Sequence, residues 1–489
     1  MEQKNTQAMT SGWRFWLLVL GMGMAGQLCW NIENQWFTTF VYAKIGGNVS
    51  VVTAMVIASA LVTTIATFVF GTLSDRLGKR KMFVCYGYII WGIATILFGF
   101  TEYARASGIG LLVSLSSFLV VVADAVMSFF GSMGYDSGYN VWLNDHITEQ
   151  NQGQVGASLA ALPVLGTVVG TVLGGLIVNI GNPTVGTDHY DPSLDNYQRL
   201  FWMMGLFVIA IGIMALFIMR DHPDTRPAKE GTFWQHLVSV FRFSTLKGNT
   251  QNKEMFLANG IICLFFIPFN FYFVHLGNWL IYDIGMTSGD MGLIEGIGLM
   301  AAVLVTIPFI KLINKNKIPL VTLIAIVTNA IGLFLLYICV QSASDVNVAS
   351  LFSLQNIPLF ACVFLVGVGY VLIMQAGTIW VKSLFPEGSR GQFEGVRIIF
   401  FVLLPMMIGT VLGNIIIKNT PQDEIIYDTY GHPIDVPQEN LFLYAAILVL
   451  FALIPLYFAA KEYRKRLANA SVLAKTPTDE TETSEDSAE

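Results

Sequence analysis

The stretch GTLSDRLGKRK, residues 71–81, joins two long apolar segments and carries four bases, one acid and two glycines. A short basic run between two apolar segments is typical of a connection between membrane-spanning helices. Whether this stretch is only a connection or also a working part of the protein depends on the sequence around it.

The composition indicates that most of the chain lies in a membrane. Of its 489 residues, 54% are hydrophobic and 12% are charged, and the mean hydropathy is +0.61. A soluble protein carries about 25% charged residues. Apolar stretches of about 20 residues recur and lack the short alternation of barrel strands, so we expect an all-α integral membrane protein. The twelve expected transmembrane helices are residues 13–41, 50–73, 82–101, 110–142, 155–180, 200–219, 255–282, 290–312, 318–341, 357–384, 394–417 and 440–461.

A polar stretch divides these spans into two sets of six. It contains an amphipathic segment at 233–246, which we expect to lie along the membrane surface. The chain ends in a run with six acids and no base at 477–489, a composition typical of disorder. The expected domains are an N-terminal six-helix half at 1–219, a cytoplasmic central loop with an amphipathic helix at 220–254, a C-terminal six-helix half at 255–462 and a disordered acidic cytoplasmic tail at 463–489.

The basic residues are distributed unevenly between the two sides of the expected membrane. Twelve spans put both termini on one side, and that side receives 23 of the 27 lysines and arginines. The other side receives only Lys44, Arg105, Arg199 and Lys418. By the positive-inside rule, both termini and residues 71–81 are expected in the cytoplasm of a multi-pass protein of the plasma or inner membrane.

The two halves resemble each other at a constant offset. The connection VWLNDHITEQNQGQV after the fourth span corresponds to IWVKSLFPEGSRGQF after the tenth, with Trp142 and Trp380 238 residues apart. The same offset places residues 71–81 over a degenerate basic copy, FIKLINKNKIP. Two six-helix repeats of the same orientation imply a pseudo-two-fold axis along the membrane normal and a site at the midplane between them.

The pattern Gly71-x-x-x-Asp75-Arg76-x-Gly78-Lys79-Arg80-Lys81 between the second and third spans resembles the signature loop of the major facilitator superfamily. With twelve spans in a 6+6 repeat, the resemblance covers nearly the whole chain. It implies secondary active transport by alternating access. The first span, GQLCWNIENQWFTTFVY, further resembles that of sugar–cation symporters, the group of glycoside–pentoside–hexuronide and sucrose transporters, although the second span lacks that group's aspartates.

The fifth span contains a motif that indicates a different group of transporters. GTVVGTVLGG, residues 166–175, partly matches the glycine motif of proton-coupled drug antiporters, with Thr171 in place of its proline. A small-residue face that lets helices approach closely explains the same residues, and we favour that interpretation.

Polar residues in the first span form one continuous stripe. On a 3.6-residue period, Gln27, Trp30, Asn31, Asn34 and Thr38 fall within about 100° of one another. Such a stripe is costly against lipid, so it either lines a wet cavity that binds hydroxyls and a sugar ring or bonds to neighbouring helices. We expect it to line a substrate cavity.

Acids within spans are candidates for binding the coupling ion, because a charge there is costly. Asp124 lies near the middle of the fourth span and is the first choice. Glu33 lies about 120° from the stripe of the first span and either exchanges a proton or makes a structural hydrogen bond. Glu295, between glycines in the eighth span, is a second coupling or substrate group.

Further substrate-cavity candidates come from both halves. In the fourth span they are Asp136, Tyr139 and Asn140, which bind substrate or close a gate. The seventh span, the repeat of the first, supplies a histidine that either titrates near neutral pH or stays neutral and hydrogen-bonded. The candidates of the second half are His275, Asn278, Trp279 and Gln375.

Residues 71–81 are expected to act as a conformational gate and not as a contact with the solute. Gly71 is expected to allow close helix contact and Gly78 a tight turn. Asp75 is expected to bind a helix N-terminus or to pair with bases. The predicted gate comprises Gly71, Asp75, Arg76, Gly78, Lys79 and Arg80, with Glu394 and Arg397 as a pair at the start of the eleventh span.

Enzyme functions are not indicated. The sequence has no nucleotide-binding glycine loop, nucleophile elbow or metal-ligand cluster, and its five cysteines fall in apolar runs without paired spacing. We expect no cofactor, no metal and no nucleic-acid partner. We expect a monomer in the lipid bilayer that takes up a sugar, glycoside or similar polar solute with H⁺ or Na⁺. The alternatives are proton-coupled efflux of amphiphilic compounds and a non-transporting membrane sensor on a carrier fold.

Overall fold

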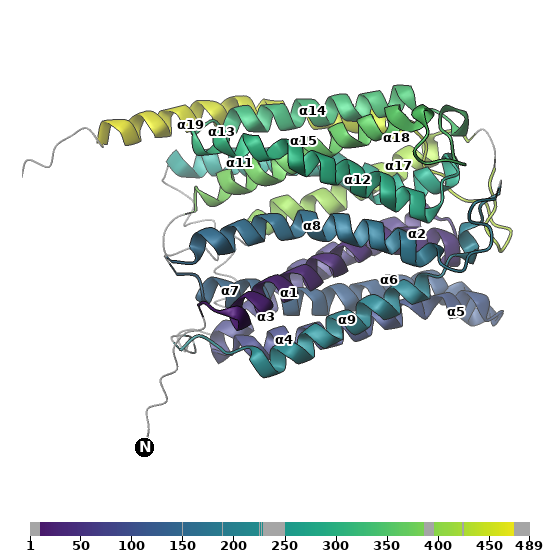
Figure 1. The fold of residues 1–489 in the computed structure, drawn as a ribbon, viewed down its shortest axis with the longest axis horizontal. Coiled ribbons are helices and arrows are strands. Elements are labelled where there is room, and N and C mark those ends of the chain that lie inside the picture. Colours follow the sequence, from purple (N-terminus) through teal and green to yellow (C-terminus); the bar gives the residue numbers. More distant parts are fainter. Residues whose placement is uncertain are drawn as a thin grey trace, which may run out of the picture.

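The computed structural model describes residues 10–148, 150–187, 189–223, 225, 227, 250–385, 396–422 and 425–473. In these residues the regular structure is helical, apart from one isolated antiparallel bridge between Tyr427 and Pro433. Twelve helices in this part of the chain are long and apolar enough to cross a membrane, which confirms the predicted architecture. They form two bundles side by side, and the start of α1 and the end of α19 lie at the same end of the molecule (Figure 1).

Six spans form the N-terminal half, and several are composed of consecutive α- and π-helical segments. They are α1 (Trp13–Asn31) with η1 (Ile32–Trp36), α2 (Phe37–Phe40) and η2 (Val41–Ile45); α3 (Val49–Leu77); α4 (Arg80–Gly99) with α5 (Thr101–Ala106); α6 (Gly110–Gly131) with η3 (Ser132–Tyr139) and α7 (Asn140–Asp145); α8 (Gln152–Asn179); and α9 (Tyr197–Ile218).

Six spans form the C-terminal half. They are α11 (Thr250–Asn278) with η6 (Trp279–Asp283); α12 (Ser288–Thr306) with η7 (Ile307–Phe309) and α13 (Ile310–Asn314); α14 (Ile318–Cys339); α15 (Ile357–Lys382); η10 (Ile399–Leu403) with α17 (Leu404–Asn419); and α18 (Asn440–Leu450) with α19 (Leu453–Leu473). We call the end of the molecule with the termini the terminal end. We call the opposite end the loop end; it holds the 3₁₀ turns η4 (Pro192–Leu194), η8 (Ala343–Asp345) and η9 (Leu354–Asn356).

Two π-helical segments interrupt spans of the N-terminal half near their middle. They are η1, which holds Glu33, and η3, which holds Asp136. A π turn adds one residue to the helical repeat and is frequent at functional sites. Side chains beyond such a turn therefore leave the faces that a 3.6-residue period assigns to them.

Helix α8 packs closely on α1 through glycines spaced four residues apart. A Cβ added to Gly166 would lie 2.5 Å from Gln27 Cβ, and one added to Gly170 would lie 2.4 Å from Asn31 Oδ1. These distances are shorter than van der Waals contact, so only glycine fits there. The structure thus supports the small-residue interpretation of residues 166–175.

The same helix joins the two halves. A Cβ on Gly175 of α8 would lie 2.5 Å from the carbonyl oxygen of Ser288, and one on Gly292 of α12 would lie 2.5 Å from that of Thr171. Both obstacles are backbone atoms, which do not rotate away. Helices α8 and α12 therefore hold the halves in close contact.

Two expected domain boundaries need correction. Helix α19 runs to Leu473, so the first part of the range expected as a disordered tail is helical. Helix α11 begins at Thr250, inside the range expected as central loop. The expected amphipathic segment 233–246 and residues 474–489 lie outside the described residues.

The substitution Gly87→Ala is expected to destabilise the N-terminal half. A Cβ on Gly87 of α4 would lie 2.4 Å from Gly134 Cα in η3, and relieving the clash costs about 1–3 kcal/mol, as overpacking does elsewhere. Thermal unfolding in detergent, followed by tryptophan fluorescence, measures the effect. The control is Gly260→Ala in α11, where the nearest atom is 4.0 Å away. Equal melting temperatures for the two variants would contradict this packing.

Candidate functional site: a central cavity and its gates

The signature loop at the terminal end is organised by one arginine. Arg80 forms ion pairs with Asp75 at 2.5 Å and Asp145 at 3.2 Å, and it donates to Ser74 Oγ at 2.6 Å. Its side chain is 9% exposed, so these charge-assisted bonds are partly shielded from water. The pairing of Asp75 with a base of the same loop is one of the two roles expected from the sequence.

The turn between the second and third spans depends on Gly78 and an aspartate from another span. Gly78 ends α3 in the left-handed region, with φ 60°, as the tight turn required. Asp221, after α9, accepts hydrogen bonds from the backbone N–H groups of Arg80 at 3.0 Å and Lys81 at 2.7 Å, and so caps the start of α4. No local pattern in the sequence predicted this partner.

Other predicted gate residues are placed differently. The expectation for Gly71 is wrong in this conformation, since a Cβ added there would meet no atom within 4 Å. Arg76 is half-buried and Lys79 is exposed. Arg397 lies over the ring of Phe401 at 5.1 Å, a cation–π contact, and its expected partner Glu394 lies outside the described residues.

The substitution Arg80→Ala is expected to lower the free energy of unfolding by about 2 kcal/mol, because it removes charge-assisted bonds and leaves two acids side by side. Lys79→Ala removes an exposed base one residue away and should leave the melting temperature nearly unchanged. Thermal unfolding of both variants in detergent checks the difference. If both variants melt at the wild-type temperature, Arg80 does not organise the loop.

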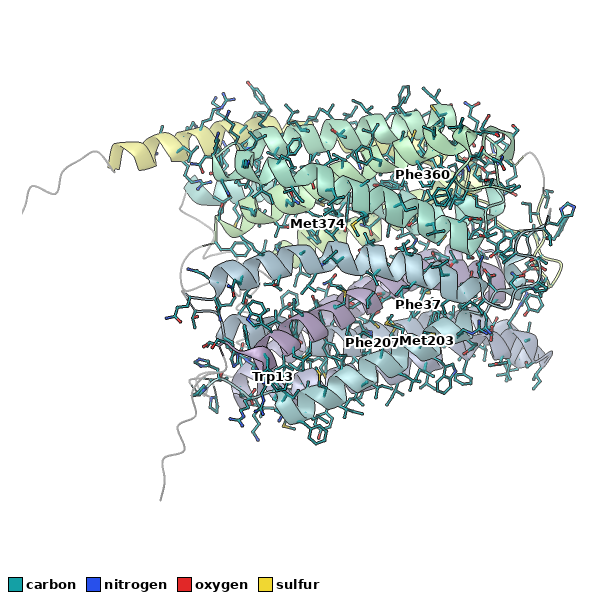
Figure 2. The ribbon with its side chains drawn as sticks, viewed as in Figure 1. Trp13, Phe37, Met203, Phe207, Phe360 and Met374 are labelled. Carbon is teal, nitrogen blue, oxygen red and sulfur yellow. The ribbon has the colours of Figure 1, made fainter. Side chains whose placement is uncertain are left out.

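A cavity of about 350 Å³ lies between the two halves. Met374 of α15 lines it, and Figure 2 shows this side chain in the region between the two bundles. The wall from the N-terminal half is mostly polar, and the wall from the C-terminal half is mostly apolar with several aromatic rings. The polar lining of the first wall is Gln27, Trp30, Asn31, Glu33, Asn34, Ser59, Thr63, Asp136, Thr167 and Thr171, and the aromatic lining of the second is Phe266, Phe269, Tyr272, Phe273, Tyr370 and Phe401.

Glu33 reaches this cavity and also contacts the fourth span. Its Oε1 accepts from Ser59 Oγ of α3 at 2.5 Å and lies 2.7 Å from Ser128 Oγ of α6. Ser128 Oγ also lies 2.9 Å from the backbone oxygen of Asp124. The second oxygen of Glu33 has no hydrogen-bond partner among the described residues. Both interpretations of Glu33 are therefore compatible with its geometry.

Asp124 is more deeply buried than Glu33 and does not line the cavity. It is 1% exposed, and its Oδ1 has no hydrogen-bond partner among the described residues. Its carboxyl is close enough to that of Glu33 for the two groups to interact electrostatically, so the two acids form one buried cluster. The ion pairs between described residues involve neither acid.

A chain of hydrogen bonds links α1 to α12 across the cavity. Asn31 Nδ2 donates to Thr171 Oγ1 at 3.1 Å, and Thr171 Oγ1 donates to Gln35 Oε1 at 2.7 Å. Gln35 Nε2 then donates to Glu295 Oε2 at 2.5 Å, which joins the N-terminal half to the C-terminal half. Gln35 was not predicted, because a 3.6-residue period leaves it outside the predicted stripe and the π turn at 32–36 turns it toward Asn31. The run of amides in NIENQ was the available signal.

The other predicted cavity residues divide into two groups. Gln27, Trp30, Asn31, Asn34 and Asp136 line the cavity together with Glu33 and Glu295. Gln27 Nε2 donates to Tyr135 OH at 2.7 Å, and Asn34 Nδ2 donates to the backbone oxygen of Trp30 at 2.7 Å.

The second group lies outside the lining. Tyr139 is buried and donates to the backbone oxygen of Val19, while Asn140 and Gln375 are half-buried away from the cavity. In the seventh span, His275, Asn278 and Trp279 are 0% exposed, because α11 presents a different face, with Phe269, Tyr272 and Phe273, to the cavity. In this structure, these residues therefore do not reach a solute bound in the cavity.

At the loop end, a buried carboxyl of the N-terminal half binds the first residue of α12. Asp195 Oδ2 accepts from Ser288 Oγ at 2.6 Å and from Tyr190 OH, and Asp195 Oδ1 accepts from Asn182 Nδ2 at 2.8 Å. We call these four residues the loop-end latch. Burial raises the pKa of Asp195 above its usual value, although its hydrogen-bond donors and the charge of Lys44 act in the opposite direction.

A second contact closes the same end of the molecule. Asp435, before α18, donates its backbone N–H to the oxygen of Gly47 at 2.7 Å. Its side chain accepts from the N–H of Val49 at 3.0 Å, and its backbone oxygen accepts from Tyr42 OH at 2.9 Å. The two halves are thus joined by hydrogen bonds at the loop end on both sides of the cavity.

Two six-helix bundles around a polar central cavity define a membrane carrier. The chain belongs to the Major Facilitator Superfamily, which it matches over residues 18–354 and 262–482, and it is therefore a transporter of a small molecule across a lipid bilayer. No match was found among curated proteins.

Solved structures share the fold. A mutant form of nucleoside transporter NupG is 13% identical, with a TM-score of 0.63 and coverage of 91% of this chain and 99% of that one. A bacterial homologue of the human lysosomal transporter Spinster, inward-facing and unoccupied, is 13% identical, with a TM-score of 0.62 and coverage of 93% and 98%. A bacterial metal transporter is 14% identical, with a TM-score of 0.51 and coverage of 90% and 98%.

Acidification is expected to favour closure of the loop end. The buried Asp195 holds a proton more tightly than the same carboxyl exposed to water, so protonation stabilises the closed latch. This contribution is fully present below the pKa of the exposed carboxyl and is lost as the pH rises through the raised pKa of the buried one. Spin-label distances between cysteines introduced at Val185 and Val348, which are 41% and 46% exposed, measure closure.

The short distance should gain population as the pH falls through the raised pKa of Asp195 toward that of an exposed aspartate, about 3.9. Asp195→Asn should remove this dependence, and Asp191→Asn, a change four residues away, should keep it. The labelled background carries Cys339→Ser, since Cys339 is exposed. A pH response that survives Asp195→Asn would assign the titration to another group.

Proposed function

We propose that this transporter imports a sugar, glycoside or similar polar solute together with H⁺ or Na⁺. The observation that carries the proposal is Glu33, a buried carboxyl that lines the central cavity and interacts electrostatically with the buried carboxyl of Asp124. An uncompensated charge in that position is costly, and binding of a cation or proton removes the cost. Loading of the cavity is thereby linked to ion binding.

The proposed orientation places the terminal end in the cytoplasm of the plasma or inner membrane. Its support is the distribution of bases, of which 23 of 27 fall at that end or in the segments connected to it. The conformation described here, with the halves joined at the loop end, then corresponds to a transporter closed toward the outside. We expect the monomer to be the working unit.

Transport in this proposal follows from differential binding to two conformations. The ion at Glu33 and Asp124 and the solute between the polar and aromatic walls together favour a state in which the halves change their contact. Glu295 links solute binding to the N-terminal half, because its carboxylate already accepts a hydrogen bond from Gln35 of that half. The loop-end latch opens when the solute site faces outward.

Proton-coupled efflux of amphiphilic compounds is a second candidate. The aromatic wall from Phe266 to Phe401 favours it, since an apolar compound with a polar group would contact both walls. The two candidates differ in direction and in the solute, and the same vesicles test both. A sensor would bind solute without flux.

The substitution Glu33→Gln is expected to abolish uphill accumulation and to preserve solute exchange. Glutamine retains the size and hydrogen-bonding oxygen of the side chain and removes its charge. Proteoliposomes with an imposed pH or Na⁺ gradient and a labelled phenyl β-glucoside measure accumulation, and counterflow without a gradient measures exchange. Accumulation should fall at least tenfold, equivalent to about 1.4 kcal/mol.

Asp124→Asn should reproduce the loss, because the two acids form one cluster. The matched control is Glu462→Gln, a change in an acid of α19 that pairs with Lys253 and Lys465 away from the cavity. Normal accumulation by Glu33→Gln would refute its assignment as the coupling acid. Gradient-driven loss of solute from the vesicles would support efflux.

A further inference from the structure

The charges around the central cavity have one sign. Glu33, Asp136 and Glu295 line it, and none of the described residues in the lining is a lysine, an arginine or a histidine. An anionic group placed there would lose its hydration, meet nearby carboxyls and find no basic side chain among those residues. The lining therefore disfavours anionic solutes.

Two residues that line the cavity carry hydrogen-bond acceptors that lack donors. Asn31 Oδ1 and Glu295 Oε1 have no partner among the described residues, although both side chains are more than nine-tenths buried, at 5% and 8% exposed. An amide oxygen and a carboxylate oxygen accept hydrogen bonds, and buried acceptors of this kind are normally satisfied. Both oxygens have almost no surface open to the cavity, so donors of an occupant reach them when the two side chains turn toward it.

The two acceptors belong to different halves and are separate from each other. The chain through Thr171 and Gln35 lies between them, and it satisfies Asn31 Nδ2 and Glu295 Oε2. A compound with several hydroxyls offers donors from different atoms to both positions. A single ammonium group offers all its donors from one atom and fits two separated acceptors less well.

The opposite wall is rich in aromatic rings. Phe269 stacks on Phe273 at 4.8 Å with an interplanar angle of 15°, and on Tyr370 at 5.0 Å with an angle of 11°. Phe266 and Phe401 lie 4.7 Å apart beside them. Such a surface favours a planar ring over a flexible or strongly hydrated group.

We propose that the solute is an uncharged, hydroxyl-rich compound that carries a flat aromatic group, an aryl glycoside being the matching chemistry, and that hexuronides and other anions are rejected. The proposal rests on the assignment of this cavity as the solute site under the proposed function. The hydroxyls bind Asn31 and Glu295, and the ring packs on Phe269 and Tyr370. The volume of about 350 Å³ lies within the usual range of small-molecule pockets, about 300–1,000 Å³.

Equilibrium binding to the purified wild-type protein, without any gradient, tests this selectivity with four probes. Phenyl β-glucoside should bind. Phenyl β-glucuronide, in which a carboxylate replaces the hydroxymethyl group, and methyl β-glucoside, which lacks the aromatic ring, should each bind at least tenfold more weakly. Tyramine, which has a ring and an ammonium group, should also bind more weakly. Equal affinity for glucoside and glucuronide, tighter binding of tyramine, or no binding of any glycoside would overturn the proposal.

Two variants separate recognition from general damage to the fold. Glu295→Gln removes the charge and retains the size, so the preference for glucoside over glucuronide should fall about tenfold. Phe269→Leu should reduce the preference for phenyl over methyl glucoside and leave the preference against the glucuronide. Glu462→Gln should change neither ratio. An unchanged preference in Glu295→Gln would refute the role of Glu295.

The outcome of this binding experiment is independent of the outcome of the transport experiment. Selective binding of phenyl β-glucoside without gradient-driven uptake would refute the proposed function and leave the selectivity of the cavity standing. Coupled uptake that accepts glucuronide as readily as glucoside would refute the selectivity and leave coupled import standing.

Discussion

The close packing of α8 against α1 on one side and α12 on the other is the constraint on which the rest of the structure depends. Glycines at 170 and 175 bring the backbone of α8 to the side chain of Asn31 and to the carbonyl of Ser288. This proximity lets Thr171 reach Gln35, and Gln35 then reaches Glu295 in the other half. Larger residues at these positions would separate the helices and break the chain of hydrogen bonds.

The same packing lets the contact between the halves break and form again, because it consists of small residues and hydrogen bonds. Helix–helix contacts in lipid gain little from the hydrophobic effect, so small residues and hydrogen bonds hold them together. At the loop end those bonds converge on Asp195 and Asp435, two carboxyls within reach of solvent when the halves separate. Water can replace each bond, which keeps the closed state within a few kcal/mol of an open one.

The sequence predicted the twelve spans, the tight turn at Gly78, the pairing with a base as one of two roles for Asp75, and the glycine face of α8, because each has a local signal. Gln35, Asp221 and Asp195 were not predicted, because their partners lie in other spans. The helical periodicity of one span does not reveal a contact with another span. The sequence placed His275 and Trp279 in the cavity by analogy with the first span. The π-helical turn at 32–36 changes the face of the first span, and α11 presents Phe269, Tyr272 and Phe273 to the cavity, so the analogy fails side chain by side chain.

The partners of Glu33 and Glu295 imply different roles for the two carboxyls. Glu33 is held by serines of its own half, so neutralising it changes the electrostatic cost of the cavity without breaking a contact between halves. Glu295 is held by Gln35 of the other half, so a solute that competes for its oxygens acts directly on the relative position of the halves. Under the proposed function, ion binding and solute binding therefore act through different bonds, and only their combination satisfies both carboxyls. In that proposal the carrier requires both ligands before it changes conformation.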